Sequence, residues 1–226
     1  MGSPVGKGPA NPGPGESALQ VPGSTEPVQA VLFDFGGVLA DEGFRNGLVA
    51  LARLQGLDAG DLPRQGMQAV YDSGFVLGRG SAADFWSLLR GRTGLTGDDR
   101  DLTERILSGF VLRPQMLDLV RRLRAAGFIT GILSDQTHWL EDLDRRDPFL
   151  ADFDRVYNSY HLGKGKRDPT LFPDVAADLG IAPSTILFID DDAGNCERAR
   201  RAGMRALIYR SRTELEAWLS KQAGRH

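Results

Sequence analysis

The apolar positions from residue 28 onward follow two alternating patterns. Short runs rich in β-branched and aromatic residues predict five buried β-strands, at residues 28–35, 128–134, 155–159, 185–190 and 205–209. Segments with helical spacing lie between them, as in the apolar residues of the run from Met116 to Leu123, which ends ahead of Gly127. Strands that alternate with helices predict an α/β fold, in which right-handed crossovers join an open parallel sheet.

One stretch interrupts this alternation. Residues 41–113 contain only helical patterns, divided by glycine-containing turns, at residues 44–54, 63–75, 81–92 and 98–110. So long a helical segment after the first strand exceeds a simple crossover. We therefore predict an inserted helical cap above the carboxyl edge of the sheet, where it would exclude water from a site at that edge.

The ends of the chain complete the predicted domain organisation. Residues 1–27 contain twelve glycines or prolines and almost no large apolar side chains, so they cannot bury enough surface to offset the entropy of ordering. We predict a disordered tail over residues 1–27, a catalytic core formed by residues 28–40 and 114–226, and the cap over residues 41–113.

Composition and charge narrow the possible partners. The chain has 226 residues and a net charge of −3 without a basic stripe, so we expect neither nucleic acid nor a membrane as a partner. A small molecule becomes the favoured ligand. The single cysteine, Cys196, excludes an internal disulfide and fits a reducing compartment. No apolar run of about 18 residues and no signal peptide are present, so the cytoplasm is the expected location.

Polar side chains lie at the ends of three predicted strands: Asp34 at the first, Ser134 and Asp135 at the second, and Asp190, Asp191 and Asn195 at the fourth. The carboxyl ends of parallel strands meet at one edge, where α/β sheets bind their ligands, so we expect these residues to lie together. An unpaired buried charge costs several kcal/mol. Asp34 should therefore have a compensating partner nearby.

The loop after the third predicted strand supplies positive charge. It carries Lys164, Lys166 and Arg167, so two of the chain's four lysines lie within three residues of each other. A lysine ammonium is a compact point charge, unlike the planar fork of arginine. We expect one of these lysines to act at the acidic edge.

These groups together favour phosphoryl chemistry. Carboxylates from two strands approach each other at neutral pH only when a proton or a cation intervenes, and hard oxygen ligands suit Mg²⁺. Ser134 can donate a hydrogen bond to a phosphoryl oxygen, and a lysine can neutralise another. Asp34 would then be the nucleophile, forming an aspartyl-phosphate that water hydrolyses. The expected substrate is a small phosphorylated metabolite.

Four motifs carry a family resemblance. The order "DFGGV", "LSDQT", "GKGKRDP" and "FIDDDAGN" resembles that of the haloacid dehalogenase-like hydrolase superfamily over about residues 30–210. Within it, the chain is most similar to the branch containing the phosphatase domain of soluble epoxide hydrolase and sugar-phosphatase-like relatives. The resemblance implies a Rossmann-like core with strand order 5-4-1-2-3 and a helical cap inserted between the first two motifs.

The resemblance also implies roles for individual residues. It makes Asp34 the nucleophile, Ser134 the motif-two hydroxyl and Lys166 the motif-three lysine. The residues it implies for substrate phosphate are Ser134, Asp135 and Lys166. The implied Mg²⁺ site consists of Asp34, Asp190, Asp191 and the backbone carbonyl of Gly36, with Asn195 in support.

The chain departs from the family pattern at Gly36. Most phosphatases of the family carry a second aspartate at this position, the general acid that protonates the leaving alcohol. Loss of this general acid lowers the rate by on the order of 10²- to 10⁴-fold, so activity would be slow or limited to phosphates with good leaving groups. Asp41, Asp135 and His138 are candidates to replace it, and water or the substrate itself are equally open alternatives.

Two other functions compete with a phosphatase. A haloacid dehalogenase also uses an aspartate nucleophile but needs no metal, and the acidic fourth motif argues against it. A non-catalytic regulatory or interaction protein is the stronger alternative, because loss of the general acid is one way in which an enzyme can lose its activity. Retention of the nucleophile, hydroxyl, lysine and carboxylates argues against that reading, since an idle site would hold repelling charges without benefit.

Several residues near the motifs have ordinary structural explanations. Asp192 is expected to cap the following helix, Lys164 to be a solvated charge, and Cys196 to be a small core residue. In the cap, Phe75, Arg79 and Trp86 are candidates to face the substrate, and the sequence does not indicate which of them does. The sequence does not indicate an oligomeric state.

Overall fold

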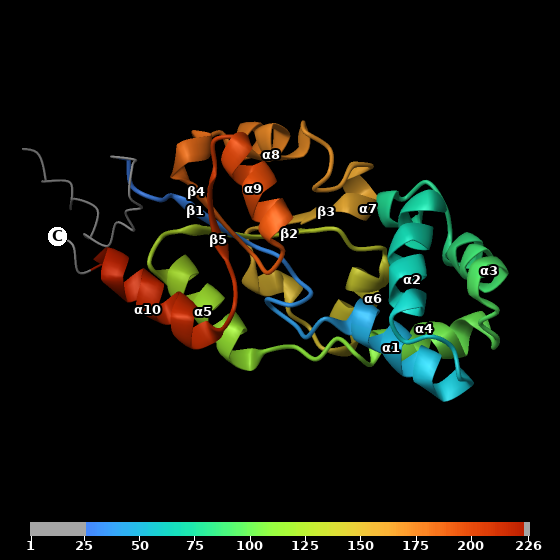
Figure 1. The fold of residues 1–226 in the computed structure, drawn as a ribbon. Helices are drawn as coiled ribbons and strands as arrows, with labels where there is room; N and C mark the ends of the chain where they lie inside the picture. The colour runs from blue at the N-terminus through green and yellow to red at the C-terminus, as the bar shows by residue number, and fades with distance from the viewer. Residues whose placement is uncertain (1–25, 224–226) are drawn as a thin grey trace, which may run out of the picture.

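The computed structural model describes residues 26–223 (Figure 1). The disordered tail predicted for residues 1–27 therefore falls, except for its last two residues, outside the described part of the chain. Among the described helices, none combines the length and apolar composition needed to cross a bilayer.

A five-stranded parallel sheet forms the centre of the core. Its strands are β1 (Ala30–Phe33), β2 (Ile129–Ser134), β3 (Arg155–Asn158), β4 (Ile186–Asp190) and β5 (Arg205–Ile208). They are arranged in the order β3-β2-β1-β4-β5, with Ala30 in register with Ile129 on one side and Ile186 on the other. The predicted α/β class, the five strands and the order 5-4-1-2-3, counted from the opposite edge, are confirmed.

Helices cover both faces of this sheet (Figure 1). One face packs against α5 (Pro114–Ala125) and α10 (Arg212–Ala223), and the other against α8 (Leu171–Leu179) and α9 (Ala193–Arg201). Successive residues of β1 serve opposite faces, because Val31 belongs to the first core cluster and Leu32 to the second. Burial on both sides explains why β1 is a continuous apolar run rather than an alternating one.

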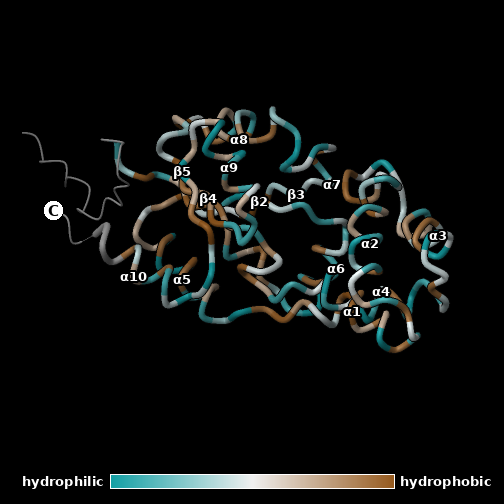
Figure 2. The backbone as a smooth tube through the Cα atoms, in the orientation of Figure 1, coloured by the Kyte–Doolittle hydropathy of each residue, from teal (hydrophilic) through white to brown (hydrophobic). Residues whose placement is uncertain are grey.

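Shorter elements connect these layers. They are α6 (Trp139–Arg146), α7 (Ser159–Leu162) and the 3₁₀ turns η2 (Leu150–Asp152) and η3 (Pro183–Thr185). Figure 2 shows brown, apolar stretches where β4 and β5 run through the core, and brown alternating with teal along the surrounding helices. This alternation is the pattern of helices that bury one side and expose the other.

Four helices follow β1 in the range predicted for the cap, and we call them the cap helices. They are α1 (Gly43–Gln55), α2 (Asp61–Asp72), α3 (Ala82–Thr93) and α4 (Asp99–Leu107), with the 3₁₀ turn η1 (Phe75–Leu77) between α2 and α3. Figure 1 shows them beyond one end of the sheet. The division of the chain into domains at residues 41 and 113 stays a prediction.

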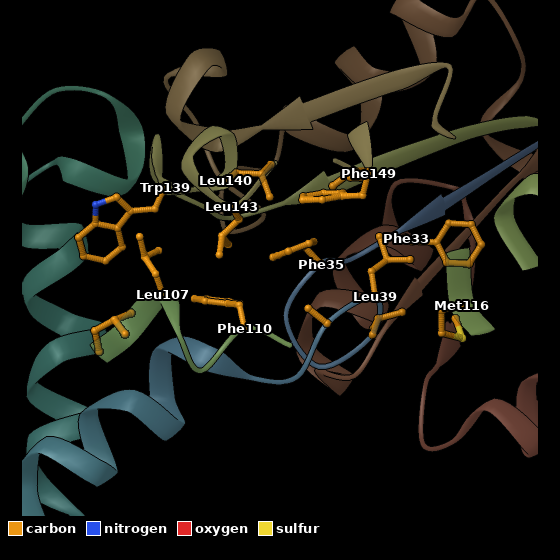
Figure 3. Close-up of a cluster of buried hydrophobic side chains, with 14 of the residues drawn as sticks. Phe33, Phe35, Leu39, Leu107, Phe110, Met116, Trp139, Leu140, Leu143 and Phe149 are labelled. Atoms are coloured by element: carbon orange, nitrogen blue, oxygen red, sulfur yellow. The ribbon is translucent and has the colours of Figure 1, made fainter. Parts of the chain in front are cut away.

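An aromatic band joins the cap helices to the core (Figure 3). Phe35, just after β1, stacks on Phe110 at 5.7 Å between ring centroids and on Phe149 at 5.1 Å. Trp139 of α6 meets Phe75 of η1 edge to face at 5.1 Å. The two parts thus share one apolar cluster, which holds the cap helices above the carboxyl ends of the strands.

Candidate active site

Asp34 follows the last residue of β1 and lies at the carboxyl edge of the sheet. Its backbone N–H donates to the Ile189 carbonyl at 2.8 Å, which continues the pairing of β1 with β4. Its side chain is largely buried, and Oδ1 accepts a hydrogen bond from Ser134 Oγ at 2.6 Å. Because Ser134 ends β2, two neighbouring strands bring this carboxylate and hydroxyl into contact.

Lys166 supplies the partner that Asp34 requires. Its Nζ lies 2.7 Å from Asp34 Oδ1 and 2.6 Å from Asp190 Oδ2, and only 2% of its side chain is exposed. Burial alone would lower the pKa of Lys166, but the surrounding carboxylates raise it above its ordinary value. Burial raises the pKa of Asp34 to about 7, an effect that Lys166 opposes and Asp190 increases. The ammonium therefore remains charged inside the site.

Asp190, the last residue of β4, is fully buried and held by several donors. Besides Lys166, it accepts hydrogen bonds from the Asp192 backbone N–H at 2.7 Å and from Asn195 Nδ2 at 3.0 and 3.2 Å. Asp192 caps α9 through the Asn195 backbone N–H, as predicted, and Cys196 is fully buried, also as predicted. The position of Asp190 is thus fixed from the start of α9.

Asp135 holds the loop that carries Lys166. Its carboxylate accepts hydrogen bonds from the Lys166 backbone N–H at 2.9 Å and from the hydroxyl of Tyr71 at 2.5 Å. A carboxylate cannot donate to a phosphoryl oxygen, so any phosphate contact by Asp135 would fall to its backbone N–H. Tyr71 belongs to α2, and its bond to Asp135 links a cap helix directly to the carboxyl edge of the sheet. Nothing in the sequence pattern had singled out Tyr71.

Asp191 provides the carboxylate best suited to a cation. One oxygen from each of Asp34, Asp190 and Asp191 lies within 4.8 Å of the others. Burial raises the pKa of Asp191, and the charge of Asp190 adds to the increase. No ion pair among the described residues includes Asp191, so the single ammonium of Lys166 leaves this group of three carboxylates undercompensated. Such a set of oxygen ligands fits Mg²⁺.

Gly37 lets the backbone approach this cluster. Its φ is +81°, and a Cβ built on it would lie 2.3 Å from Asp191 Oδ2, closer than real Cβ contacts come. Arg113 secures the same loop by donating to the Gly37 carbonyl at 2.6 Å and pairing with Asp41. Only glycine fits at position 37.

Glu42 is an acidic residue of the site that sequence reasoning missed. It caps α1, where its Oε1 accepts the Arg45 backbone N–H at 3.2 Å. Burial raises the pKa of Glu42, and the charge of Asp191 adds to the increase, while the Arg45 N–H opposes it. The one sequence feature that pointed to Glu42 is its position next to Asp41, which is a candidate for the general acid.

Most of these groups, but not Asp190 or Gly37, line a cavity of about 340 Å³, a size that suits a small molecule. The carboxyl edge contributes the predicted residues Asp34, Gly36, Ser134, Asp135, Lys166, Asp191 and Asn195. The cap helices contribute Met67, Val70 and Tyr71, and the guanidinium groups at the cavity are Arg45, Arg167 and Arg198. The cavity therefore lies between the acidic edge and the cap helices.

Several candidates from the sequence lie elsewhere. The carboxylate of Asp41 is 52% exposed and pairs with Arg113 at 3.0 Å, and His138 packs against the ring of Phe75. Neither residue lines the cavity. Phe75 and Trp86 are fully buried in the core, Arg79 donates to the Gly163 carbonyl at 2.8 Å, and Lys164 pairs with Asp174. None of the three cap candidates, nor Lys164, lines the cavity.

A comparison with protein families decides the classification. A family model described as a haloacid dehalogenase-like hydrolase matches residues 28–203. The chain belongs to the haloacid dehalogenase-like hydrolases. The resemblance carried by the four motifs is therefore confirmed, and the match to a hydrolase family agrees with the predicted class of enzyme.

The chain is also similar to curated proteins of different kinds. It is 29% identical to phosphatase MT3486 of Mycobacterium tuberculosis over 195 residues, which cover 80% of this chain and 87% of that protein. It is 31% identical to bifunctional epoxide hydrolase 2 of Rattus norvegicus over 117 residues, or 48% of this chain. The match covers only 21% of the epoxide hydrolase.

Several solved structures have the same fold as this chain. A HAD family enzyme of Bacteroides thetaiotaomicron, solved in complex with magnesium and inorganic phosphate, aligns with a TM-score of 0.63 at 22% identity, over 83% of this chain and 98% of that one. L-2-haloacid dehalogenase of Xanthobacter autotrophicus, with chloropropionic acid covalently bound, aligns with a TM-score of 0.61 at 19% identity, over 86% and 83%. Both likenesses concern the fold.

Proposed function

We propose that this protein is a Mg²⁺-dependent hydrolase of small phosphorylated molecules, with Asp34 as its nucleophile. The observation that carries the proposal is the contact of Asp34 Oδ1 with both Ser134 Oγ, at 2.6 Å, and Lys166 Nζ, at 2.7 Å. A carboxylate, a hydroxyl donor and a buried ammonium at the wall of one cavity suit the binding and attack of a phosphoryl group.

The chain's own residues account for two chemical steps. In the first, an oxygen of Asp34 forms a bond to phosphorus as the bond from phosphorus to the leaving oxygen breaks, and the electron pair departs with that oxygen. In the second, water attacks phosphorus and the bond to Asp34 breaks, which releases phosphate and restores the carboxylate. Ser134 and Lys166 hold phosphoryl oxygens through hydrogen bonding and charge.

The acidic edge fits a bound Mg²⁺. We propose Asp34, Asp191 and the Gly36 carbonyl as direct ligands, and Asp190 as the carboxylate that completes the set while orienting Lys166. Bound there, Mg²⁺ would supply positive charge that shields the approach of the two anions. Asn195 and Asp192 hold Asp190 in position through the hydrogen bonds described above.

The comparisons support the same reaction class. One relative is named a phosphatase, and one structure of the same fold was solved with magnesium and inorganic phosphate. The fold is also that of a haloacid dehalogenase. The cluster of Asp34, Asp190 and Asp191 favours a phosphatase function over dehalogenation, because dehalogenation does not require a metal ion.

Hydrolysis of p-nitrophenyl phosphate by the purified protein tests the proposal. We expect turnover in Mg²⁺, its loss in EDTA, and its loss in Asp34→Asn. The matched control is Asp41→Asn, since Asp41 is exposed and lies outside the cavity, and it should retain turnover within about two-fold of the parent. Absence of turnover in the parent, as a non-catalytic protein would show, or full activity of Asp34→Asn, would contradict the assignment.

A further inference from the structure

Position 36 has no side chain, but the space beside it is occupied. A Cβ built on Gly36 would lie 2.9 Å from Glu42 Oε2, with Phe110 Cε1 at 3.6 Å and Gln136 Nε2 at 3.8 Å. The nearest atom to the missing side chain is therefore a carboxylate oxygen. Glu42 reaches from the start of α1 into the volume that a side chain at position 36 would fill.

The two oxygens of Glu42 have different surroundings. Oε1 accepts the Arg45 backbone N–H at 3.2 Å and so caps α1. Oε2 is the oxygen next to Gly36, and Glu42 lines the same cavity as Asp34. A carboxyl group that keeps one oxygen on a helix cap is held in place, while the other remains available to a ligand in the cavity.

The other carboxylates that line the cavity already have distinct partners or positions. Asp135 accepts from Lys166 and Tyr71, and Asp192 caps α9. Asp191 lies against the Gly37 backbone in the acidic cluster, and Asp34 is the proposed nucleophile. Glu42 is the remaining carboxyl group among the described lining residues.

We propose that Glu42 is the general acid of this enzyme, taking the place of the side chain absent at Gly36. The inference rests on the proposed phosphatase function. As the bond from phosphorus to the leaving oxygen breaks, the proton on Glu42 Oε2 passes to that oxygen, which departs as a neutral alcohol. In the second step Glu42 accepts a proton from the attacking water, so the carboxyl group ends the cycle as it began.

A purely structural role predicts a different behaviour. If Glu42 only caps α1, Glu42→Gln should be nearly silent, because the amide oxygen can still accept the Arg45 N–H. The amide cannot deliver a proton. Glu42→Gln therefore separates the two roles while it preserves the size of the side chain.

The test compares leaving groups of different quality. We expect Glu42→Gln to lower kcat on an alkyl phosphate by about 10²- to 10⁴-fold, but to lower kcat on p-nitrophenyl phosphate, whose leaving group needs little assistance, by less than about ten-fold. Asp41→Asn, the neighbouring exposed carboxylate, should change neither. The double variant Gly36→Asp with Glu42→Ser should recover at least about ten-fold on the alkyl ester relative to Glu42→Ser alone, because serine can still cap α1, leaves the space beside position 36 free, and the acid returns from position 36.

The outcomes distinguish this inference from the proposed function. If the parent hydrolyses both esters and Asp34→Asn neither, but Glu42→Gln keeps alkyl turnover within about three-fold, Glu42 is not the acid and the phosphatase assignment stands. An equal loss on both esters also overturns the inference, because loss of a general acid must slow the alkyl ester more than the aryl ester. A parent inactive on both esters overturns the proposed function and this inference together.

Discussion

The ammonium of Lys166 lies 2.6 Å from the carboxylate of Asp190, and their side chains are 2% and 0% exposed. Lys166 also contacts Asp34, so one buried cation balances two carboxylates from adjacent strands. Removing one member of a buried ion pair leaves an uncompensated charge, which costs far more than loss of an exposed pair. The carboxyl edge of the sheet, where we propose the active site, is therefore also a determinant of the stability of the core.

Lys166→Met should destabilise the protein severely. It keeps most of the aliphatic stem but removes the charge, so we expect the free energy of unfolding in urea to fall by about 3–5 kcal/mol. The matched control is Lys164→Met, because Lys164 pairs with Asp174 nearer the surface, where 58% of the Asp174 side chain is exposed. The control should lose less than about 1 kcal/mol. Equal losses of unfolding free energy in the two variants would mean that the buried ion pair contributes no more to stability than the pair nearer the surface.

Gly37→Ala should weaken the binding of Mg²⁺. The new Cβ would meet Asp191 Oδ2 at 2.3 Å, so that carboxylate must move, and a φ of +81° strains any side chain. Gly163→Ala is the control, since Gly163 has a φ of +68° but nothing within 4 Å of its Cβ. Calorimetric titration should show weaker Mg²⁺ affinity for Gly37→Ala alone. Parent-like affinity in that variant would argue against Asp191 as a ligand.

Stability without Mg²⁺ should depend on the ionisation of Asp34. Burial raises the pKa of Asp34 from 3.8 to about 7, so the folded protein holds this proton more tightly than the unfolded chain does. Its contribution to stability is therefore complete below the lower value and is lost as the pH rises through the higher one. In EDTA, the free energy of unfolding of the parent should fall relative to that of Asp34→Asn between about pH 4 and pH 7. A constant difference across this range would refute a raised pKa.

Much of the candidate site at the carboxyl edge could be predicted because it depends on strands. Parallel strands align their carboxyl ends, so the chain positions of Asp34, Ser134 and Asp190 were enough to place them together. Lys166 followed from the motif after the third strand. The cap formed by Asp192 followed from ordinary chain-local chemistry. Lys164 was predicted to be a solvated charge, but its side chain is only 25% exposed and pairs with Asp174.

The cap side of the site could not be predicted in the same way. Tyr71 reaches Asp135 across the junction of the cap helices with the core, where Phe35 also stacks on Phe110 and Phe75 meets Trp139. Those contacts join residues far apart in the sequence. Similarly, two adjacent side chains point in different directions just before α1. Asp41 pairs with Arg113 outside the cavity, whereas Glu42 lines the cavity. No periodicity specifies the direction of a side chain at such a junction.

Chemical trapping of the covalent intermediate tests the central claim most directly. The protein is mixed with p-nitrophenyl phosphate and Mg²⁺, quenched during turnover and treated with borohydride, which reduces an aspartyl-phosphate to homoserine. We expect mass spectrometry of the peptide that spans residue 34 to show homoserine at that position in the parent and in Asp41→Asn. Continued turnover with unmodified aspartate at residue 34 in every quenched sample would contradict the assignment of Asp34 as the nucleophile.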